Sequence, residues 1–145
     1  MATAQRVDPY RNFNFLVEID GITQAGFTEC SGFDMTTDPI EYREGGDNTT
    51  PRKLPGLGKF GNIVLKWGLT DSFDLYNWYR DVTNGRIERR TGSIVIFDLD
   101  NKTERARWNF KDAWPTKYNP ADVNAKSNEI AIETLEIAIE GIERV

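Results

Sequence analysis

The sequence contains no histidine and only one cysteine, Cys30. Histidine is the most common general base and the most common metal ligand in proteins. Its absence excludes Ser-His-Asp and Cys-His catalytic sites, and every zinc site that uses a histidine. A single cysteine forms no intramolecular disulfide, which agrees with assembly in a reducing cytoplasm.

The chain also lacks long apolar runs and an excess of basic charge. No stretch approaches the roughly 20 apolar residues of a membrane helix, and the first residues do not follow the pattern of a secretory signal. We therefore expect synthesis in the cytoplasm without a signal peptide, and no membrane insertion by this chain. The net charge of −5 argues against generic nucleic-acid binding. The length of 145 residues fits one domain, residues 1–145.

Alternation of apolar and polar residues predicts several β-strands. Residues 12–20 alternate cleanly and end in the turn pair Asp20-Gly21. One face of this strand carries Phe13, Phe15, Val17 and Ile19. Further strands are predicted for residues 26–35, 40–42 and 62–67. Residues 90–99 and 104–110 predict a hairpin with its turn at Asp100-Asn101, which Trp114-Pro115 ends before a polar loop at 117–127.

Residues 70–85 predict a helix with one apolar stripe. Its members, Leu75, Trp78, Tyr79 and Val82, follow helical spacing. Thr70, Asp71 or Ser72 is expected to cap the start, and Asn84-Gly85 to end it. The stripe predicts that the helix packs on a sheet and that Trp78 belongs to the core.

Residues 129–142 fit two structures. A strand needs a bulge or a change of burial near Glu133-Thr134, because the apolar residues change parity there. A helix would place Ile132, Leu135, Ile139 and Ile142 on one stripe. In either case the pattern predicts a mainly β fold, a small sandwich or barrel with one flanking helix.

The segment from Tyr42 to Gly61 is the most unusual part of the chain. It holds Gly45, Gly46, Gly56, Gly58, Pro51 and Pro55. Glycine and proline are unfavourable in helices and central strands, so we expect a long loop at about residues 43–60. Such loops are functional or disordered, and Leu54, Leu57 and Phe60 favour a segment that orders against a partner.

No catalytic or ligand-binding pattern stands out. Residues 56–61 resemble a phosphate loop only in glycine content, since the Gly-Lys-Ser/Thr ending and a following helix are missing. Asp98, Asp100 and Glu104 form a carboxylate group, but aspartate is ordinary at a hairpin turn. We expect no catalytic residue, no metal site and no cofactor.

Several short motifs, in order along the chain, carry a family resemblance. They are Asp8-Pro9-Tyr10-Arg11, Phe13-Asn14-Phe15, Val17-Glu18-Ile19-Asp20-Gly21, Gly26-Phe27, Glu29-Cys30-Ser31-Gly32, Glu41-Tyr42-Arg43-Glu44-Gly45-Gly46, Leu54-Pro55-Gly56, Leu65-Lys66-Trp67-Gly68, Trp108, Ala113-Trp114-Pro115 and Asn128-Glu129-Ile130-Ala131-Ile132-Glu133. Together they span nearly the whole chain. The sequence resembles the inner tube proteins of contractile phage tails and of phage-tail-like contractile injection systems.

The resemblance implies a tail-tube fold whose copies form hexameric rings, and rings that stack into a hollow tube inside a sheath. It also implies that residues 129–142 form a strand, and that the long loop reaches neighbouring subunits and the next ring. The residues expected in self-assembly are Glu44, Gly45, Gly46, Pro51, Lys53, Leu54, Pro55, Gly56, Leu57, Lys59 and Phe60. Expected partners are further copies, sheath, baseplate or tube-initiator and tail-terminator proteins, and DNA or effector cargo in the lumen, without specific nucleic-acid binding.

Two other classes of function remain open from the residues alone. A monomeric β-sandwich could bind carbohydrate through Trp67, Trp78, Trp108 and Trp114, because aromatic rings stack on sugars. An enzyme could use a carboxylate pair. Imaging distinguishes them from a tube protein, because only the tube protein forms rings or tubes.

Overall fold

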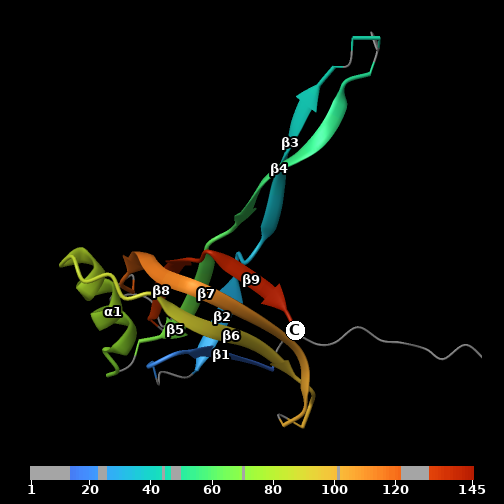
Figure 1. The fold of residues 1–145 in the computed structure, drawn as a ribbon. Helices are drawn as coiled ribbons and strands as arrows, with labels where there is room; N and C mark the ends of the chain where they lie inside the picture. Colours follow the sequence, from blue (N-terminus) through green and yellow to red (C-terminus); the bar gives the residue numbers. More distant parts are fainter. Residues whose placement is uncertain are drawn as a thin grey trace, which may run out of the picture.

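The computed structural model describes residues 14–22, 26–43, 45–46, 50–69, 71–100, 102–121 and 131–145. Its elements are β1 (Phe15–Ile19), β2 (Phe27–Ser31), β3 (Met35–Tyr42), β4 (Arg52–Phe60), β5 (Ile63–Gly68), α1 (Asp74–Thr83), β6 (Arg90–Phe97), β7 (Glu104–Asn119), β8 (Ile132–Ala138) and β9 (Gly141–Arg144). Figure 1 shows a β body with α1 at one end and a long arm, formed by β3 and β4, that projects from it. The expected mainly β fold with one flanking helix is confirmed.

The body is one antiparallel sheet that folds over on itself. Its strands follow the order β1-β6-β7-β8-β5-β2, and β9 pairs with β7. β7 connects the two halves, because its first part pairs with β6 and β9 and its last part, from Trp114, pairs with β8. Between the two parts, Asp112 has a φ of 53°, a conformation that residues other than glycine seldom adopt. The strand therefore changes direction where it passes from one half to the other.

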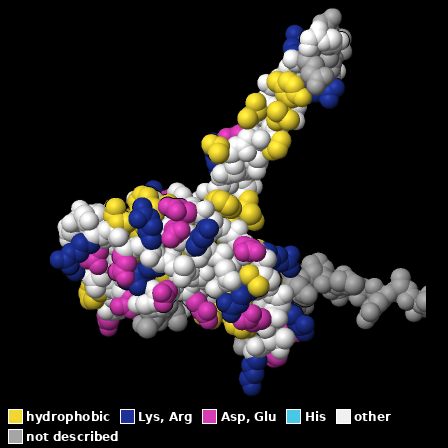
Figure 2. Space-filling view, in the orientation of Figure 1, with side chains coloured by type: hydrophobic (Ala, Val, Ile, Leu, Met, Phe, Trp, Pro, Cys, Tyr) yellow, Lys and Arg dark blue, Asp and Glu magenta, His cyan; other side chains and the backbone are white. Residues whose placement is uncertain are grey.

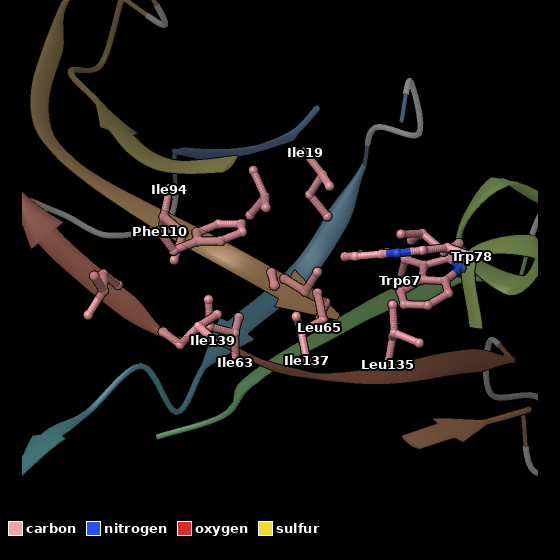
Figure 3. Close-up of a cluster of buried hydrophobic side chains, with 14 residues drawn as sticks. Ile19, Ile63, Leu65, Trp67, Trp78, Ile94, Phe110, Leu135, Ile137 and Ile139 are labelled. Atoms are coloured by element: carbon pink, nitrogen blue, oxygen red, sulfur yellow. The ribbon is translucent and has the colours of Figure 1, made fainter. Parts of the chain in front are cut away.

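The core lies between the two halves of the sheet. Figure 3 shows side chains of β5 and β8 directed toward those of β1, β6 and β7. At one end of this core, Trp67 of β5 lies beside Trp78 of α1. Ile63, Leu65, Leu135 and Ile137 are fully buried. Each such side chain contributes roughly 1.5–3 kcal/mol relative to an exposed one, so the body holds a substantial apolar core.

The first strand and the helix agree with the sequence prediction in most respects. Val17 and Ile19 are buried on one face of β1, and Gly21 has the positive φ of a turn; Phe13 lies outside the described residues. Leu75 and Trp78 are buried. The capping prediction is wrong for Asp71 and Ser72, because the N-cap of α1 is Phe73, which makes no capping hydrogen bond; Thr70 is not described.

The described part of the last segment is β structure, as the resemblance implies, and of the two ways in which a strand could fit the pattern it shows the change of burial near Glu133. Glu133, Leu135 and Ile137 are all buried on one face of β8, and Ile132 is exposed at its start. The apparent change of parity arises because Glu133 takes an inward position, where the Tyr118 hydroxyl donates a hydrogen bond to its carboxylate. Burial and this bond raise the pKa of Tyr118 to about 12.

β7 is longer than predicted. It continues through Trp114 and Pro115 to Asn119, so these residues do not end the strand. A register shift between Pro115 and Lys117 accommodates the proline beside β8. Of the loop predicted at 117–127, residues 117–119 belong to β7 and 122–127 lie outside the described residues. No helix in the described part of the chain is long and apolar enough to cross a membrane.

Candidate functional site

The segment that carries the predicted assembly residues forms half of the arm. β4 pairs antiparallel with β3, from Tyr42 opposite Arg52 to Met35 opposite Phe60. Among the described strands, neither pairs with any other, and the arm extends well beyond the body (Figure 1). The expectation of a loop at residues 43–60 is therefore wrong from Arg52 onward, where the chain is a regular strand.

Proline is compatible with this arm because both strands are edges. Pro39 and Pro55 lie opposite each other. Proline has no N–H to donate and is excluded from strands with neighbours on both sides, but an edge strand tolerates it where the missing donor would face solvent. The rule that excludes proline holds for central strands and not for a two-stranded ribbon, which is why the expected loop at residues 43–60 is wrong.

The structure places most predicted assembly residues in one strand. Lys53, Leu54, Pro55, Gly56, Leu57, Lys59 and Phe60 lie in β4. Pro51 directly precedes it, Gly45 and Gly46 form a turn in the connection, and Glu44 lies outside the described residues. Sequence reasoning missed the β3 side of the arm, where Met35, Ile40 and Tyr42 are exposed. Residues 35–42 show no continuous alternation and contain Asp38-Pro39, so the only sequence signal was the short strand predicted at residues 40–42.

Three glycines shape the arm through close backbone approaches. A Cβ on Gly56 would lie 2.6 Å from the Asp38 carbonyl oxygen, at the register shift between Thr37 and Pro39. At the base of the arm, a Cβ on Gly61 would lie 2.6 Å from the Gly32 carbonyl oxygen, and Gly32 itself has a φ of +84°. These residues let the two chain segments meet where the arm leaves the body, so they fix its direction.

The pairing register sorts the outer half of the arm into two different faces. Ile40 and Leu54 are opposite each other, so their side chains share one face with the pair Tyr42 and Arg52. The opposite face carries the charged pair Glu41 and Lys53. We call the side chains of Ile40, Leu54, Tyr42 and Arg52 the arm face. Ile40 is 54% and Leu54 49% exposed, so about half of each of these apolar side chains is open to solvent in the described structure.

Nearer the body, an exposed ion pair joins the two strands. The Lys59 ammonium group lies 2.7 Å from the Asp38 carboxylate, and this hydrogen bond raises the pKa of Lys59. Both side chains are more than half exposed, so the pair adds little to stability. Leu57, in the bulge, is 81% exposed.

A groove of about 1240 Å³ lies where the arm meets the body. Phe60 at the base of β4 contributes to its lining. The other lining residues come from β1, β6, β7 and β9, and most of them are polar or charged, including Glu18, Asp20, Glu143 and Lys111. The groove therefore combines charged side chains with apolar surface beside the arm.

The three candidate carboxylates serve local structure. Asp98 pairs with Arg105, which together with the Leu99 N–H lowers the pKa of Asp98. Asp100 accepts hydrogen bonds from the backbone of Thr103 and Lys102 and from the Thr103 hydroxyl, and its pKa falls to about 2. Glu104 pairs with Arg107, which lowers its pKa. Each carboxylate is ionised and engaged at the hairpin turn, which does not suit a general acid.

The tryptophans do not form a sugar-binding platform. Trp67 and Trp78 are 2% exposed, and the Trp78 indole N–H donates to the Glu88 carbonyl oxygen at 2.9 Å. Trp108 packs against Phe33 and under Arg144, and Trp114 is half-buried in β7. Two of the four rings are therefore inaccessible to a ligand, as the core prediction for Trp78 required.

The remaining chemical candidates are accounted for by the fold. Residues 56–60 lie in β4 and lead into β5 rather than a helix, so they do not form a phosphate loop. In the described part of the chain, no three Cys, Asp or Glu side chains are grouped to hold a metal ion. Burial and the nearby Glu29 raise the pKa of the Cys30 thiol to about 12, which makes it unreactive.

Comparison with solved structures shows which proteins share this fold. A chain in the cryo-EM structure of the anti-feeding prophage (AFP) tube-terminating cap superposes with a TM-score of 0.89 and 27% identity, covering 99% of this chain and 95% of that one. A chain of the PVC sheath-tube complex, an extracellular contractile injection system in its extended state, gives 0.85 and 25%, covering 94% and 91%. Hcp1 from Flavobacterium johnsoniae shares the fold at a TM-score of 0.56 and 18% identity, over 90% and 93% of the two chains.

The fold and the arm thus define a tube protein of the contractile tail and injection-system class. The family model described as "T4-like virus tail tube protein gp19" matches residues 11–143. The chain belongs to this family, which confirms the resemblance seen in the sequence. No curated protein matched the chain.

Proposed function

We propose that copies of this chain form hexameric rings, that the rings stack into a hollow tube inside a sheath, and that the β3–β4 arm is a principal contact between copies. The observation that carries the proposal is a two-stranded ribbon with exposed apolar side chains, on a chain of the tail-tube family. The assembly residues expected in β4 would then act as contact residues, with Gly56 shaping the bulge.

The arm favours this function because β3 and β4 pair with no other described strand. A two-stranded hairpin alone is at best marginally stable in water, and three or more strands or a packed face are needed for independent stability. Docking against another copy would supply such a face and would order the arm as it binds. A stable contact of this kind buries upwards of about 1,000 Å².

The expected partners follow from this role. Sheath, baseplate or tube-initiator and terminator proteins would contact the tube outside and at its ends, as the sheath-tube and cap assemblies of the PVC and AFP proteins suggest. DNA or effector cargo would pass through the lumen without specific binding. In this proposal residues 1–145 act as one structural unit without catalysis, made in the cytoplasm and built into a phage tail or an extracellular injection particle.

Shortening the arm tests the proposal. Met35 and Phe60 pair directly, so residues 36–59 can be replaced by an Asn-Gly turn that joins the strands at the base. We expect the shortened protein to keep the unfolding transition of the body, because the core lies outside the arm, and to form no tubes under conditions in which the intact chain does. Electron microscopy and thermal unfolding provide the measurements. Abundant long tubes of the shortened protein would contradict an assembly role for the arm.

A further inference from the structure

A second exposed apolar surface lies where the chain enters α1. Leu69, Phe73 and Tyr76 are 59%, 66% and 38% exposed. We call these three side chains the helix-entry patch. The Tyr76 ring packs against Tyr118, with ring centroids 5.3 Å apart, so part of the patch is held rigidly against the sheet. Exposed apolar side chains gathered at one helix end, unlike single scattered ones, are typical of an interaction site.

The helix-entry patch lies at the far end of β5 from the arm. β4 ends at Phe60, β5 runs from Ile63 to Gly68, and Leu69 follows directly. A strand of this length spans roughly 20 Å at about 3.3 Å per residue. The arm also points away from the body, with α1 on the other side (Figure 1). One copy therefore cannot cover its own patch with its own arm.

We propose that the helix-entry patch receives the arm face of a second copy. This proposal rests on the proposed function, since it assumes that arms contact other copies. Besides these two surfaces, the described residues expose Met35, Leu57 and Phe60 on the inner half of the arm, and separate side chains such as Ile87, Leu99 and Val145. Because the arm face and the helix-entry patch are different surfaces at separate ends, their contact is head-to-tail, the arrangement that produces closed rings or open stacks.

Charge supports the same pairing. Arg52 lies on the arm face beside Leu54 and Ile40. Asp71 and Asp74 flank Phe73, and both are exposed. One basic group, Arg80, lies 5.9 Å from the centre of the Tyr76 ring, one turn further along α1. Opposite charges at the rim of an apolar contact fix its register more than they add affinity.

The groove at the base of the arm is the competing receptor, and its chemistry fits less well. Its apolar side chains are Phe60 and the buried Ile19, Phe110 and Ile142, and they share the lining with charged groups from several strands. An arm face seated there would set Ile40 and Leu54 against charged groups such as Glu18 and Lys111. Burying polar groups without partners is unfavourable, so the apolar patch is the better match.

Phe73→Ser tests the docking surface without harming the subunit. Phe73 is the N-cap of α1 and makes no capping hydrogen bond, whereas serine is a favoured N-cap. The helix should therefore be kept or stabilised while the apolar ring is lost. We expect the protein concentration needed for tube formation to rise about tenfold or more, as for the loss of a buried interface aromatic. Ile87→Ser, which removes a 54% exposed side chain outside both surfaces, is the matched control and should leave that concentration unchanged.

A photoreactive amino acid at position 54 identifies the receptor directly in assembled tubes. We expect its crosslinks to map to residues 69–80 of another copy. If tubes form and the crosslinks map to residues 18–20 or 140–143, the groove is the receptor and the proposal is overturned. Equal assembly of Phe73→Ser and Ile87→Ser would also overturn it, while the tube function would stand. If the unmodified chain forms neither rings nor tubes, the proposed function itself fails.

Discussion

The body and the arm of this protein differ in where their apolar side chains lie: the body buries them and the arm exposes them. In the body, Ile63 and Leu65 are fully buried, whereas in the arm Leu57 and Ile40 are 81% and 54% exposed. Figure 2 shows hydrophobic side chains on the surface along the arm. The body is thus stabilised within one chain. The arm leaves apolar side chains exposed in the described structure, which is the arrangement expected of a segment that is completed by assembly.

Two leucines allow the largest and most direct comparison of the two regions. Leu65 is fully buried and Leu54 is 49% exposed. We expect Leu65→Ala to lower the free energy of unfolding of the isolated subunit by about 2–5 kcal/mol. Leu54→Ala should change it by no more than about 0.5 kcal/mol and should weaken tube formation. Urea unfolding, at protein concentrations too low for assembly, measures the two changes in the free energy of unfolding. Similar losses of stability would show that the arm is part of the subunit's own core.

A smaller effect is expected at the junction between the regions. A Cβ at Gly61 would lie 2.6 Å from a backbone oxygen, whereas at Gly58, inside the arm, the nearest atom is 4.0 Å away. Gly61→Ala should therefore lower the free energy of unfolding by about 1–3 kcal/mol and reduce tube yield, because the arm would leave the body at a different angle. Gly58→Ala is the control. Thermal unfolding and electron microscopy measure the difference in stability and in tube yield. Equal stability and equal tube yield of the two variants would contradict the structural role of Gly61 at the base of the arm.

The smallest effect concerns the turn between β6 and β7 in the body, which hydrogen bonds to Asp100 hold in place. Because hydrogen bonds to its carboxylate lower the pKa to about 2, the folded state favours the ionised form. This contribution to stability is fully present above the ordinary pKa of about 3.9 and is lost as the pH falls toward 2. A carboxyl NMR titration should show a midpoint near pH 2. A midpoint at the ordinary value would mean that the turn does not hold the carboxylate.

The body was largely predictable because its strands follow simple alternation. Val17 and Ile19 face the core as the pattern of residues 12–20 indicated, and Trp78 lies in the core as helical spacing indicated. The periodicity left strand and helix open for residues 129–142, because the apolar residues change parity at Glu133, a buried carboxylate that accepts a hydrogen bond from Tyr118. It also missed the extension of β7 past Pro115, because pairing with β8 outweighs local propensity there.

The sequence pointed to the segment that forms half of the arm, but it predicted a loop where the structure has the strand β4. Leu54, Leu57 and Phe60 indicated a segment that contacts a partner, while Pro55 and Gly56 suggested a loop. The sequence does not reveal that Pro55 faces Pro39 across a ribbon with two free edges. It also does not reveal which apolar side chains share a face, because the bulge between Thr37 and Pro39 shifts the register. Both facts depend on pairing between residues that are far apart in the sequence.

Hydrogen exchange of the arm amides tests most directly whether assembly completes the arm. We predict that β3 and β4 exchange rapidly in the isolated subunit while β5 and β8 are protected, and that the arm becomes protected by at least about tenfold in assembled tubes. Arm amides that are as protected in the isolated subunit as those of β5, or that gain no protection in tubes, would contradict the claim that the arm is stabilised between copies.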